Sequence, residues 1–289
     1  MTHIIITAGG TTEPIDGVRQ ITNTSTGRLG ACIYNALAEY LEEHPLVNSR
    51  APQNDSAAQA GTQASGFTVH YIVSQTAVRP TPKAGLPIQF YPVTDVQSVA
   101  AALEDLMTSH KVDYVIHGMA VSDFTKKYLC AQDALAGELA RAVEAAVRNE
   151  SGRNAASIQA VIEKVLAHPT LALENAEKIS SQSELFLSLG KTPKLIHMIK
   201  KWNPKTCLVG FKLLKGASDE ELLRVGTELA QKNSCDFVLV NDLDQISGDR
   251  HRALLIRDGI VVGTYETKEE IGKGIAENIF AVHTSRDTA

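Results

Sequence analysis

The stretch ITAGGTTEPIDGVRQITNTSTGRLG, from Ile6 to Gly30, decides the fold. It follows a short apolar run, His3 to Ile6, and leads into a segment where apolar residues recur at helical spacing: Leu29, Cys32, Ile33, Ala36, Leu37, Tyr40 and Leu41. A strand, a loop of small residues and a helix start together favour anion binding, because free backbone N–H groups and the positive end of the helix dipole meet there. The stretch therefore predicts an α/β domain with an oxyanion site at its first strand-to-helix turn.

The loop matches neither of the common phosphate-binding fingerprints. Gly9-Gly10 does not fit the G-x-G-x-x-G spacing, and no lysine follows at the spacing of a P-loop. A tight turn without any ligand is common in α/β domains, but this loop is longer and more polar than such a turn requires. It carries several side chains that bind oxyanions or amides: Arg19, Asn23, Ser25, Thr26 and Arg28.

Composition bounds the class of protein. The chain has 289 residues, of which 44% are hydrophobic, so it has enough apolar residues for a substantial core. A net charge of −5 argues against broad attraction to nucleic acid or to a membrane surface. No apolar run of membrane-spanning length and no secretory leader pattern is present, so we expect a cytoplasmic protein. The cysteines form no C-x-x-C pair and are expected to be buried thiols without disulfides or zinc: Cys32, Cys130, Cys207 and Cys235.

Strand and helix patterns alternate along the chain. The predicted strands are Ile4–Ile6, Thr68–Val73, Ile88–Tyr91, Asp113–His117, Thr206–Phe211 and Asp236–Asn241. This alternation predicts a three-layer, Rossmann-like α/β fold, doubly wound around a mostly parallel sheet, in one domain over residues 1–289. Two late strand patterns separated by Asp258-Gly259 predict an antiparallel hairpin, Ala253–Arg257 with Ile260–Thr264.

Several helices carry start signals. Asp95–Ser109 is amphipathic, and Asp219–Lys232 is preceded by Ser218 with Glu221 three residues later, which is a capping-box pattern. Thr267 and Glu270 repeat this pattern before a last helix that is predicted to reach about Phe280.

Two segments interrupt the alternation. Residues 49–66 contain no large apolar side chain, so they are predicted to be a flexible loop outside the core. Residues 132–168 are rich in alanine and are predicted to be a helical insertion with a break near Ser151-Gly152. This insertion fits either a dimerisation element or the support of a lid, and the sequence leaves both readings open.

The opening stretch resembles the N-terminal signature of phosphopantothenate–cysteine ligases, in their monofunctional form. The matching elements are Thr7 to Thr11, Asp16 to Arg19, and Asn23 to Gly27. Further motifs of the family follow in order along nearly the whole chain: AVSDF (Ala120 to Phe124), KISS (Lys178 to Ser181), KTPKLI (Lys191 to Ile196), LVGFKLL (Leu208 to Leu214) and LVND (Leu239 to Asp242).

The resemblance implies a ligase of coenzyme A synthesis. Such an enzyme transfers a nucleotidyl group from CTP or ATP, with Mg²⁺, to the carboxylate of 4′-phosphopantothenate and releases pyrophosphate. The amine of L-cysteine then attacks the acyl-nucleotidylate and releases the nucleoside monophosphate. Relatives of this type are homodimers. The chain starts directly at the ligase signature, so FMN and flavin-dependent decarboxylation are not expected.

By the same resemblance, four residues handle the acyl substrate and the chemistry. The amide of Asn23 binds the acyl group of the intermediate, Ala120 contacts it, and Arg19 binds the pantothenate moiety. Lys178 belongs to a flap that covers the nucleotide, and it is assigned to catalysis together with Asn23. Without the family match, Asn23 would more simply be a turn or N-cap residue.

The nucleotide is assigned to residues at the turns that follow the strands: Gly9, Ser25, Thr26, Gly27, Arg28, Asp123, Lys178, Gly210, Phe211, Lys212 and Lys232. Phe211 is expected to line the base pocket, although a phenylalanine at a strand end ordinarily belongs to the core. Lys212 stands where bacterial bifunctional enzymes carry alanine and resembles the monofunctional and eukaryotic forms, so the choice between CTP and ATP stays open. No residue is predicted to bind a metal ion in the absence of the nucleotide, since the substrate phosphates would supply most of the ligands of the magnesium ion.

Two other classes of function compete with the ligase. A dinucleotide oxidoreductase needs the glycine spacing noted above and an acidic residue after the second strand, where this chain has Ser74-Gln75. A non-catalytic nucleotide-binding protein would have kept the fold without turnover, but the presence of Asn23, Asp123 and Lys178 argues against this reading.

Overall fold

The computed structural model describes residues 1–44, 66–149, 154–173, 184–248 and 250–287. These residues form two compact units. Unit 1 comprises Met1–Thr11, Asn23–Val121 and Lys194–Ala289, and unit 2 comprises Thr12–Thr22 and Ser122–Pro193. The loop predicted at residues 49–66 lies, apart from Gly66, outside the described residues.

Unit 1 is built on an eight-stranded sheet in the order β12-β11-β10-β9-β6-β1-β4-β5. The parallel strands are β1 (Thr2–Ala8), β4 (Phe67–Ser74), β5 (Ile88–Val93), β6 (Val112–His117), β9 (Cys207–Leu214) and β10 (Phe237–Ser247). The chain starts in the middle of this sheet, runs outward to one edge, and returns to build the other half. That is the strand order of doubly wound Rossmann folds, so the predicted fold class is confirmed.

The predicted late hairpin is present. β11 (Arg250–Arg257) pairs antiparallel with β10 and with β12 (Ile260–Thr267). Asp258 and Gly259, between the two strands, both have positive φ values, 51° and 76°. Such values are required by a two-residue type I′ turn, which explains the Asp-Gly pair.

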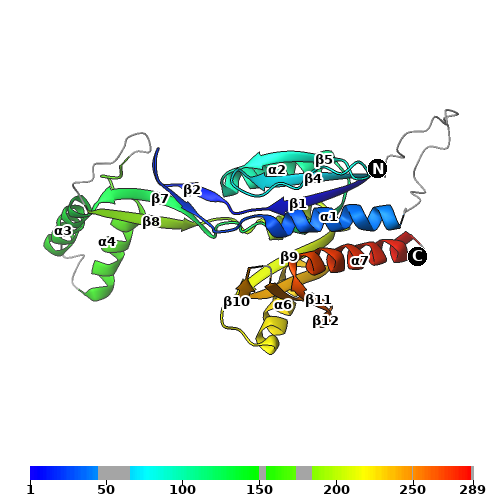
Figure 1. Ribbon diagram of the computed structural model, residues 1–289. Helices are drawn as coiled ribbons and strands as arrows, with labels where there is room; N and C mark the ends of the chain where they lie inside the picture. The colour runs from blue at the N-terminus through cyan, green and yellow to red at the C-terminus, as the bar shows by residue number, and fades with distance from the viewer. Residues whose placement is uncertain (45–65, 150–153, 174–183, 249, 288–289) are drawn as a thin grey trace. The chain divides into compact units, whose positions relative to one another are not determined.

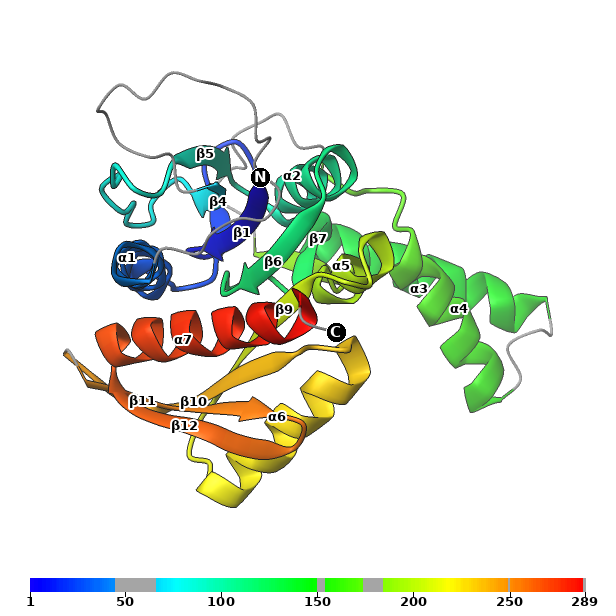
Figure 2. The same ribbon diagram turned by 90° about the vertical axis from the view of Figure 1, so that its right-hand side faces the viewer.

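Helices cover both faces of the sheet (Figure 1). α1 (Arg28–Glu43) and α7 (Lys268–Asp287) pack together on one face, over a core that includes Ile4, Ile6 and Phe280. On the opposite face lie α2 (Val96–Ser109), α5 (Ile196–Trp202) and α6 (Asp219–Asn233). Figure 2 shows α7 and α6 on opposite sides of the part of the sheet that contains β10–β12. The three-layer prediction is therefore confirmed.

The predicted helix starts are only partly as expected. Ser218 accepts a hydrogen bond from Glu221 N at 3.3 Å, but the Glu221 carboxylate pairs with Arg224 instead of closing a capping box. At α7 the Glu270 carboxylate accepts from Glu266 N at 2.7 Å, one residue earlier than the Thr267 amide that the pattern predicts. In both places a nearby donor competes successfully for the carboxylate. α7 also continues past Phe280 to Asp287.

Unit 2 contains two antiparallel ribbons and two helices. β2 (Thr12–Pro14) pairs with β3 (Gln20–Thr22), and β7 (Phe124–Ala131) pairs with β8 (Leu185–Lys191). The predicted helical insertion is present as α3 (Gln132–Arg148) and α4 (Ala155–Ala167). The sequence analysis predicted none of the strands of this unit. Its hydrophobic cluster is small and contains the buried residues Tyr128, Cys130 and Leu135.

The cysteines differ from the expectation in part. Cys130 and Cys207 are buried, but Cys32 and Cys235 are only partly so. Cys32 lies on the edge of α1 that faces the start of α7, where its thiol contacts the Glu269 carboxylate at 3.6 Å. Burial raises the pKa of the Cys32 and Cys235 thiols, the latter to about 12. Burial also raises the pKa of Cys130, so these three cysteines are thiols rather than thiolates at neutral pH.

Candidate active site

The candidate site lies where the strand order reverses, at the carboxyl ends of β1 and β6. From β1 the chain passes through α1 to β4 on one side, whereas β6 pairs with β1 on the other side. Connections that leave in opposite directions open a crevice between two strands, and open α/β sheets bind ligands at such places. The loop Gly9–Thr11 follows β1, and the loop Gly118–Ser122 follows β6.

Two glycines let the first loop pass through crowded space. Gly9 has φ +93°, and a Cβ atom there would lie 2.0 Å from Ser74 Oγ. A Cβ atom on Gly10 would lie 2.1 Å from the backbone oxygen of Asn23. Both contacts are far shorter than any real Cβ contact, so the glycines are required for the return of the chain at Asn23. The loop is a packed, defined structure rather than a flexible turn.

Asn23 and Ala120, both predicted from the resemblance, meet where the loops after β1 and β6 are joined by a parallel bridge between Gly10 and Ala120. Asn23 Nδ2 donates a hydrogen bond to Ala120 O at 3.0 Å. The same carbonyl accepts from Thr11 N at 3.1 Å, while Ala120 N donates to Gly9 O at 2.8 Å. Asn23 N is held in turn by Thr11 O at 3.1 Å. The carboxamide is therefore fixed by its backbone and by one of its own N–H groups, which leaves the other N–H and Oδ1 available to a ligand.

The start of α1 is open to an anion. Gly27 is its N-cap residue with φ 71° and has no side chain to cap the helix, and no acidic residue lies in its first turn. The Thr26 hydroxyl accepts a long hydrogen bond, 3.5 Å, from Arg28 N. A Cβ on Gly27 would lie 2.7 Å from Ala77 Cβ, so glycine is also required by packing. Thr26 O accepts a hydrogen bond from Val78 N at 2.9 Å, which ties this helix start to the end of β4. The predicted phosphate residues Ser25, Thr26, Gly27 and Arg28 thus lie at a helix N-terminus suited to oxyanions.

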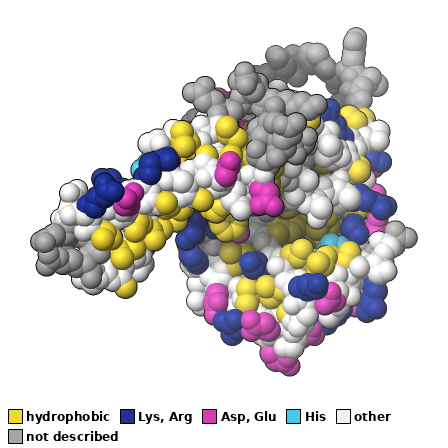
Figure 3. Space-filling model, turned by 90° about the vertical axis from the view of Figure 1, so that its left-hand side faces the viewer, with side chains coloured by type: hydrophobic (Ala, Val, Ile, Leu, Met, Phe, Trp, Pro, Cys, Tyr) yellow, Lys and Arg dark blue, Asp and Glu magenta, His cyan; other side chains and the backbone are white. Residues whose placement is uncertain are grey.

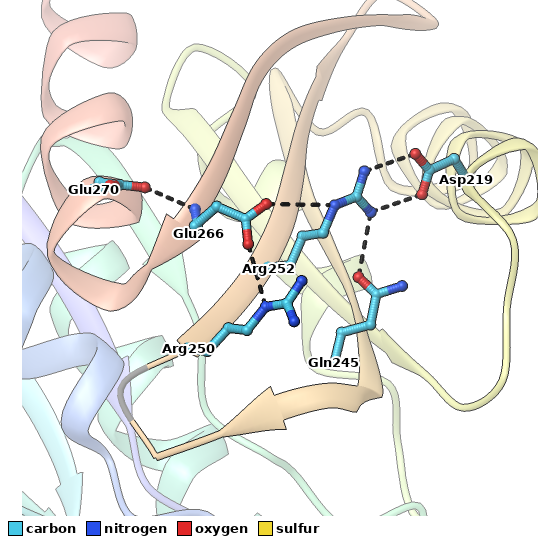
Figure 4. Close-up of polar contacts among 6 residues, drawn as sticks. All are labelled: Asp219, Gln245, Arg250, Arg252, Glu266 and Glu270. Atoms are coloured by element: carbon cyan, nitrogen blue, oxygen red, sulfur yellow. Dashed lines mark hydrogen bonds and ion pairs between the residues drawn. The ribbon is translucent and has the colours of Figure 1, made fainter.

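The start of α6, at the same edge of the sheet, is closed to anions. Its first turn carries Asp219, Glu220 and Glu221. Figure 4 shows Asp219 facing Arg252, with two contacts of 2.7 Å between the carboxylate and the guanidinium. Arg252 also contacts Gln245 and Glu266. The side-chain hydrogen bond from Arg252 lowers the pKa of Asp219, so this carboxylate stays charged. Two helices therefore begin at one edge of the sheet with opposite electrostatics.

The region around α6 and β10–β12 carries charges of both signs. Figure 3 shows basic and acidic side chains interspersed over this lower part of unit 1.

Asp242, at the end of the LVND motif, accepts hydrogen bonds from the backbone N–H groups of Asp244, Ala217 and Gly216, which lower its pKa. This carboxylate therefore braces the turn before α6.

The predicted base-pocket residues lie on β9. Gly210 pairs in register with His117, the last residue of β6, and is buried. The Phe211 ring lies against Gly118, because a Cβ atom there would be 3.6 Å from ring carbons. The ring therefore reaches the start of the loop that holds Ala120. Lys212, one residue further, is exposed.

Of the remaining four predicted residues, one lies in unit 1, two lie in unit 2 and one falls outside the described residues. Lys232 lies in the last turn of α6, which ends where β10 begins, so it is at the opposite edge of the sheet. This position makes Lys232 a poor candidate for the nucleotide. Arg19 and Asp123 belong to unit 2. Lys178 falls outside the described residues.

Arg19 is already engaged by a neighbour. Its Nε and Nη2 donate to Asp16 Oδ2 at 2.9 and 2.6 Å, while the backbone N of Arg19 donates to Asp16 Oδ1. These bonds and that from Val18 N lower the pKa of Asp16 to about 2. The Arg19 side chain is 47% exposed, against 1% for Asp16. Asp16 thus fixes Arg19 in place and leaves Nη1 toward solvent or a ligand.

The sequence analysis missed three residues that shape the site. Ser74 ends β4, and its Oγ accepts a hydrogen bond from Gly10 N at 3.3 Å, so it braces the glycine loop. β4 is the second strand of the parallel sheet in chain order, and the end of the second strand is where dinucleotide oxidoreductases carry their acidic residue. Thr7 and His117 are hydrogen-bonded at the ends of β1 and β6. A polar residue at the last positions of an apolar strand is the sequence feature that marks all three.

Within the described ranges of the chain, no three His, Cys, Asp or Glu side chains converge in a way that suits a metal ion. In the same part of the chain, no helix combines the length and apolar character needed to cross a membrane.

Comparison with known proteins decides the family. Residues 1–60 and 138–282, most of the chain, match the family described as the DNA/pantothenate metabolism flavoprotein C-terminal domain. The chain belongs to this family. Among curated members, the coenzyme A biosynthesis bifunctional protein CoaBC of Thermococcus kodakarensis is 24% identical over 96% of this chain and 50% of its own length. The chain spans about half the length of the curated relatives it matches.

Solved structures of the DNA/pantothenate metabolism flavoprotein family share the fold. The protein of that name from Streptococcus pneumoniae is 30% identical, with a TM-score of 0.69, over 98% of this chain and 100% of its own. A Cab2 variant in complex with phosphopantothenate-cysteine is 15% identical, with a TM-score of 0.59, over 98% of this chain and 87% of its own. The resemblance drawn from the sequence motifs is thereby confirmed at the level of family and fold.

Proposed function

We propose that this chain joins 4′-phosphopantothenate to L-cysteine through an acyl-nucleotidylate, with CTP or ATP as co-substrate, in coenzyme A synthesis. The observation that carries the proposal is the Asn23 carboxamide, held on Ala120 O at 3.0 Å at the crevice between β1 and β6. Beside it lies the uncapped start of α1, which suits the phosphates of a nucleotide. Membership of the family and the names of its relatives support the same reaction.

The reaction needs positioning more than a protein nucleophile. A carboxylate oxygen of phosphopantothenate attacks the α-phosphorus of the nucleotide, and the bond from that phosphorus to pyrophosphate breaks. The cysteine nitrogen then attacks the acyl carbon, the bond from that carbon to the nucleotidyl oxygen breaks, and the nitrogen loses a proton to solvent. Two anions must be brought together in the first step, so preorganised N–H donors and a helix N-terminus lower its barrier.

Asn23 suits the second step. One of its N–H groups is used by Ala120 O, which directs the other toward the acyl oxygen, where negative charge develops when the amine attacks. Oδ1 accepts a hydrogen bond from the incoming amine. An amide performs both tasks without carrying a charge, so it does not protonate the nucleophile.

The nucleotide occupies the neighbouring surface in this proposal. Gly9, Ser25, Thr26, Gly27 and Arg28 bind phosphates at the start of α1. Mg²⁺ accompanies the triphosphate and withdraws charge from it.

The base and the acyl substrate take the remaining predicted residues. Gly210, Phe211 and Lys212 line the base, which lies near Gly118. Arg19, Asp123 and Lys178 retain the roles implied by the resemblance: the pantothenate moiety, the nucleotide and the flap. Lys232 is left out because of its place at the other edge of the sheet.

The proposal includes a setting. We treat residues 1–289 as one ligase domain made of the two units, acting as a homodimer in the cytoplasm. The proposed reaction uses no flavin, although the family's description names a flavoprotein. The oxidoreductase alternative is disfavoured by Ser74, whose Oγ bonds Gly10 N in place of a ribose-binding carboxylate.

A turnover assay on the purified protein tests the function. The protein is mixed with 4′-phosphopantothenate, L-cysteine and Mg²⁺, with CTP and ATP in parallel, and pyrophosphate and the coupled product are followed. Product that needs all three substrates supports the ligase, and a single burst of pyrophosphate without cysteine supports the acyl-nucleotidylate. A folded protein that makes no product with either nucleotide refutes the proposal and favours a non-catalytic nucleotide-binding protein.

A further inference from the structure

Thr7 and His117 form a buried polar pair directly behind the site. Thr7 is the next-to-last residue of β1, His117 is the last residue of β6, and the two are partners in the register of these strands. Thr7 is fully buried, and His117 is 8% exposed. An apolar core surrounds a polar pair only at a cost, unless the groups satisfy one another.

The pair is linked to the loop after β6. Thr7 Oγ1 lies 3.1 Å from His117 Nδ1 and accepts a hydrogen bond from Met119 N at 3.1 Å. Burial lowers the pKa of His117 to about 4, so its ring is neutral near pH 7. A neutral ring with its proton on Nε2 lets Nδ1 accept from the Thr7 hydroxyl, whose lone pairs remain for Met119 N.

Met119 immediately precedes the carbonyl that holds the Asn23 amide. The residue that carries this carbonyl, Ala120, also donates through its backbone N to Gly9 O at 2.8 Å. The Met119–Ala120 segment is thus held by the Thr7 hydroxyl of β1 and, in the loop after β1, by Gly9 O and Thr11 N. The position of Ala120 O, and with it the direction of the Asn23 carboxamide, follows from these attachments, of which Thr7 supplies the one to a side chain.

We propose that Thr7 and His117 are a positioning pair for the ligase: they touch no substrate but orient Asn23 through Met119 and Ala120. This inference rests on the proposed function and adds two residues to it. The hydroxyl, rather than the bulk of Thr7, carries the effect, because its oxygen makes the hydrogen bonds to both His117 and Met119.

The test compares Thr7→Val, which removes the hydroxyl at nearly constant shape, with Thr7→Ser, which keeps it. We expect Thr7→Val to lower kcat by about ten-fold, the size of one neutral hydrogen bond, with the nucleotide KM within about two-fold. Thr7→Ser retains kcat within about two-fold. The matched control is Thr206→Val, since Thr206 is equally buried and its hydroxyl finds no hydrogen-bond partner among the described residues. That control keeps wild-type kcat.

A double-mutant cycle separates positioning from general loss of structure. If Thr7 acts through Asn23, then Thr7→Val lowers kcat by less than about two-fold in an Asn23→Ala background. The inference is overturned if the two substitutions lower kcat independently, so that their fold-changes multiply in the double variant, or if the Thr7→Val enzyme keeps wild-type kcat. Neither result contradicts the proposed ligase activity. A wild-type protein without ligase activity overturns the function itself.

A spectroscopic reading tests the same geometry without turnover. In ¹⁵N-edited spectra, Thr7→Val shifts the Asn23 side-chain amide signals and speeds hydrogen exchange at Met119 N. Thr206→Val changes neither. Unchanged Asn23 signals in a folded Thr7→Val protein refute the positioning role, whatever the assay shows.

Discussion

At the scale of single residues, Asn23 is the most demanding position of the site. Its backbone oxygen lies where a Cβ atom on Gly10 would be, at 2.1 Å, and its side chain reaches Ala120 O at 3.0 Å. The residue therefore has little freedom to move, and its free N–H group points in a direction set by the backbone. Preorganisation of this kind is what makes a neutral amide effective against developing charge.

Removal of this amide should abolish most of the turnover. We expect Asn23→Ala to lower kcat by about 100-fold, as for loss of one oxyanion donor, with little change in stability. The control is Asn278→Ala, because Asn278 Nδ2 also donates to a backbone carbonyl, that of Gly274 at 2.8 Å, but within α7. Steady-state kinetics of the two variants should differ widely, and an Asn23→Ala enzyme within a few-fold of wild type would contradict the assignment.

The glycine loop should tolerate no side chain. We expect Gly10→Ala to destabilise the protein by about 1–3 kcal/mol, since a methyl group overlaps the Asn23 backbone oxygen and packed structures yield little. Gly17→Ala is the control, because a Cβ atom there meets nothing within 4 Å. Urea unfolding compares the two variants, and equal stabilities would show that the loop relaxes freely.

Sequence reasoning singled out Asn23, Ala120 and Gly27 because each stands in a short, contiguous motif. These motifs follow one another along the chain in the order found in the family. The same reasoning assigned no role to Thr7, although Thr7 opens the first motif, and it did not single out His117, because their partnership depends on strand register. It placed Lys232 at the nucleotide because a motif match carries no information on which end of a helix faces the site.

At the scale of elements, the ends of helices decide where anions bind. α1 begins with no acidic residue in its first turn, whereas α6 begins with Asp219, Glu220 and Glu221.

Both helices were predicted correctly from the sequence. It could predict the parallel strands as well, since they are apolar throughout and bounded by turns. The ribbon of β7 and β8 escaped it, because a two-stranded ribbon leaves apolar residues such as Phe124, Phe186 and Leu189 partly exposed and so lacks a buried-strand pattern.

A charge reversal at the start of α1 tests the nucleotide assignment. We expect Arg28→Glu to raise the nucleotide KM by about ten-fold, because a carboxylate in the first turn competes with phosphate for the helix N-terminus. The control is Arg148→Glu, at the exposed end of α3, which makes the same change of charge and loses an exposed ion pair with Glu144. Equal KM values for the two variants would remove Arg28 from the nucleotide site.

At the scale of the whole molecule, buried histidines should govern stability in mild acid. Burial is the main cause that lowers the pKa of His70, His117 and His251, each to about 4, from an ordinary value of 6.5. Between these values the unfolded chain binds more protons than the folded one, so protonation favours unfolding. Stability is therefore fully present above about pH 6.5 and falls as the pH is lowered toward 4.

Thermal unfolding between pH 7 and pH 4 measures this effect. The midpoint should fall steadily through the window, and His251→Gln should make the fall shallower, since one titrating group is lost. A surface control is His168→Gln, at the end of α4. If the midpoint stays level down to pH 4, the histidines are protonated in the folded state and the expectation is wrong.

The division of the chain into two units illustrates what local patterns do not contain. Unit 2 joins Thr12–Thr22 to Ser122–Pro193, pieces that lie about a hundred residues apart in sequence. Periodicity assigns each segment its type, but it does not tell which distant segments share a core. The composition of the chain was consistent with one large domain or two small ones, and contacts between remote segments distinguish the arrangements.

The contrast between the starts of α1 and α6 has a kinetic consequence. A triphosphate that diffuses to this edge of the sheet meets carboxylates at the first turn of α6, Glu220 among them, and attraction over Gly27 at the start of α1. The long-range field therefore turns the polyanion before any contact forms, so fewer encounters end in the wrong orientation. Because ions in solution damp this field, the guiding effect should weaken as ionic strength rises, even though every short-range contact of the bound nucleotide stays the same.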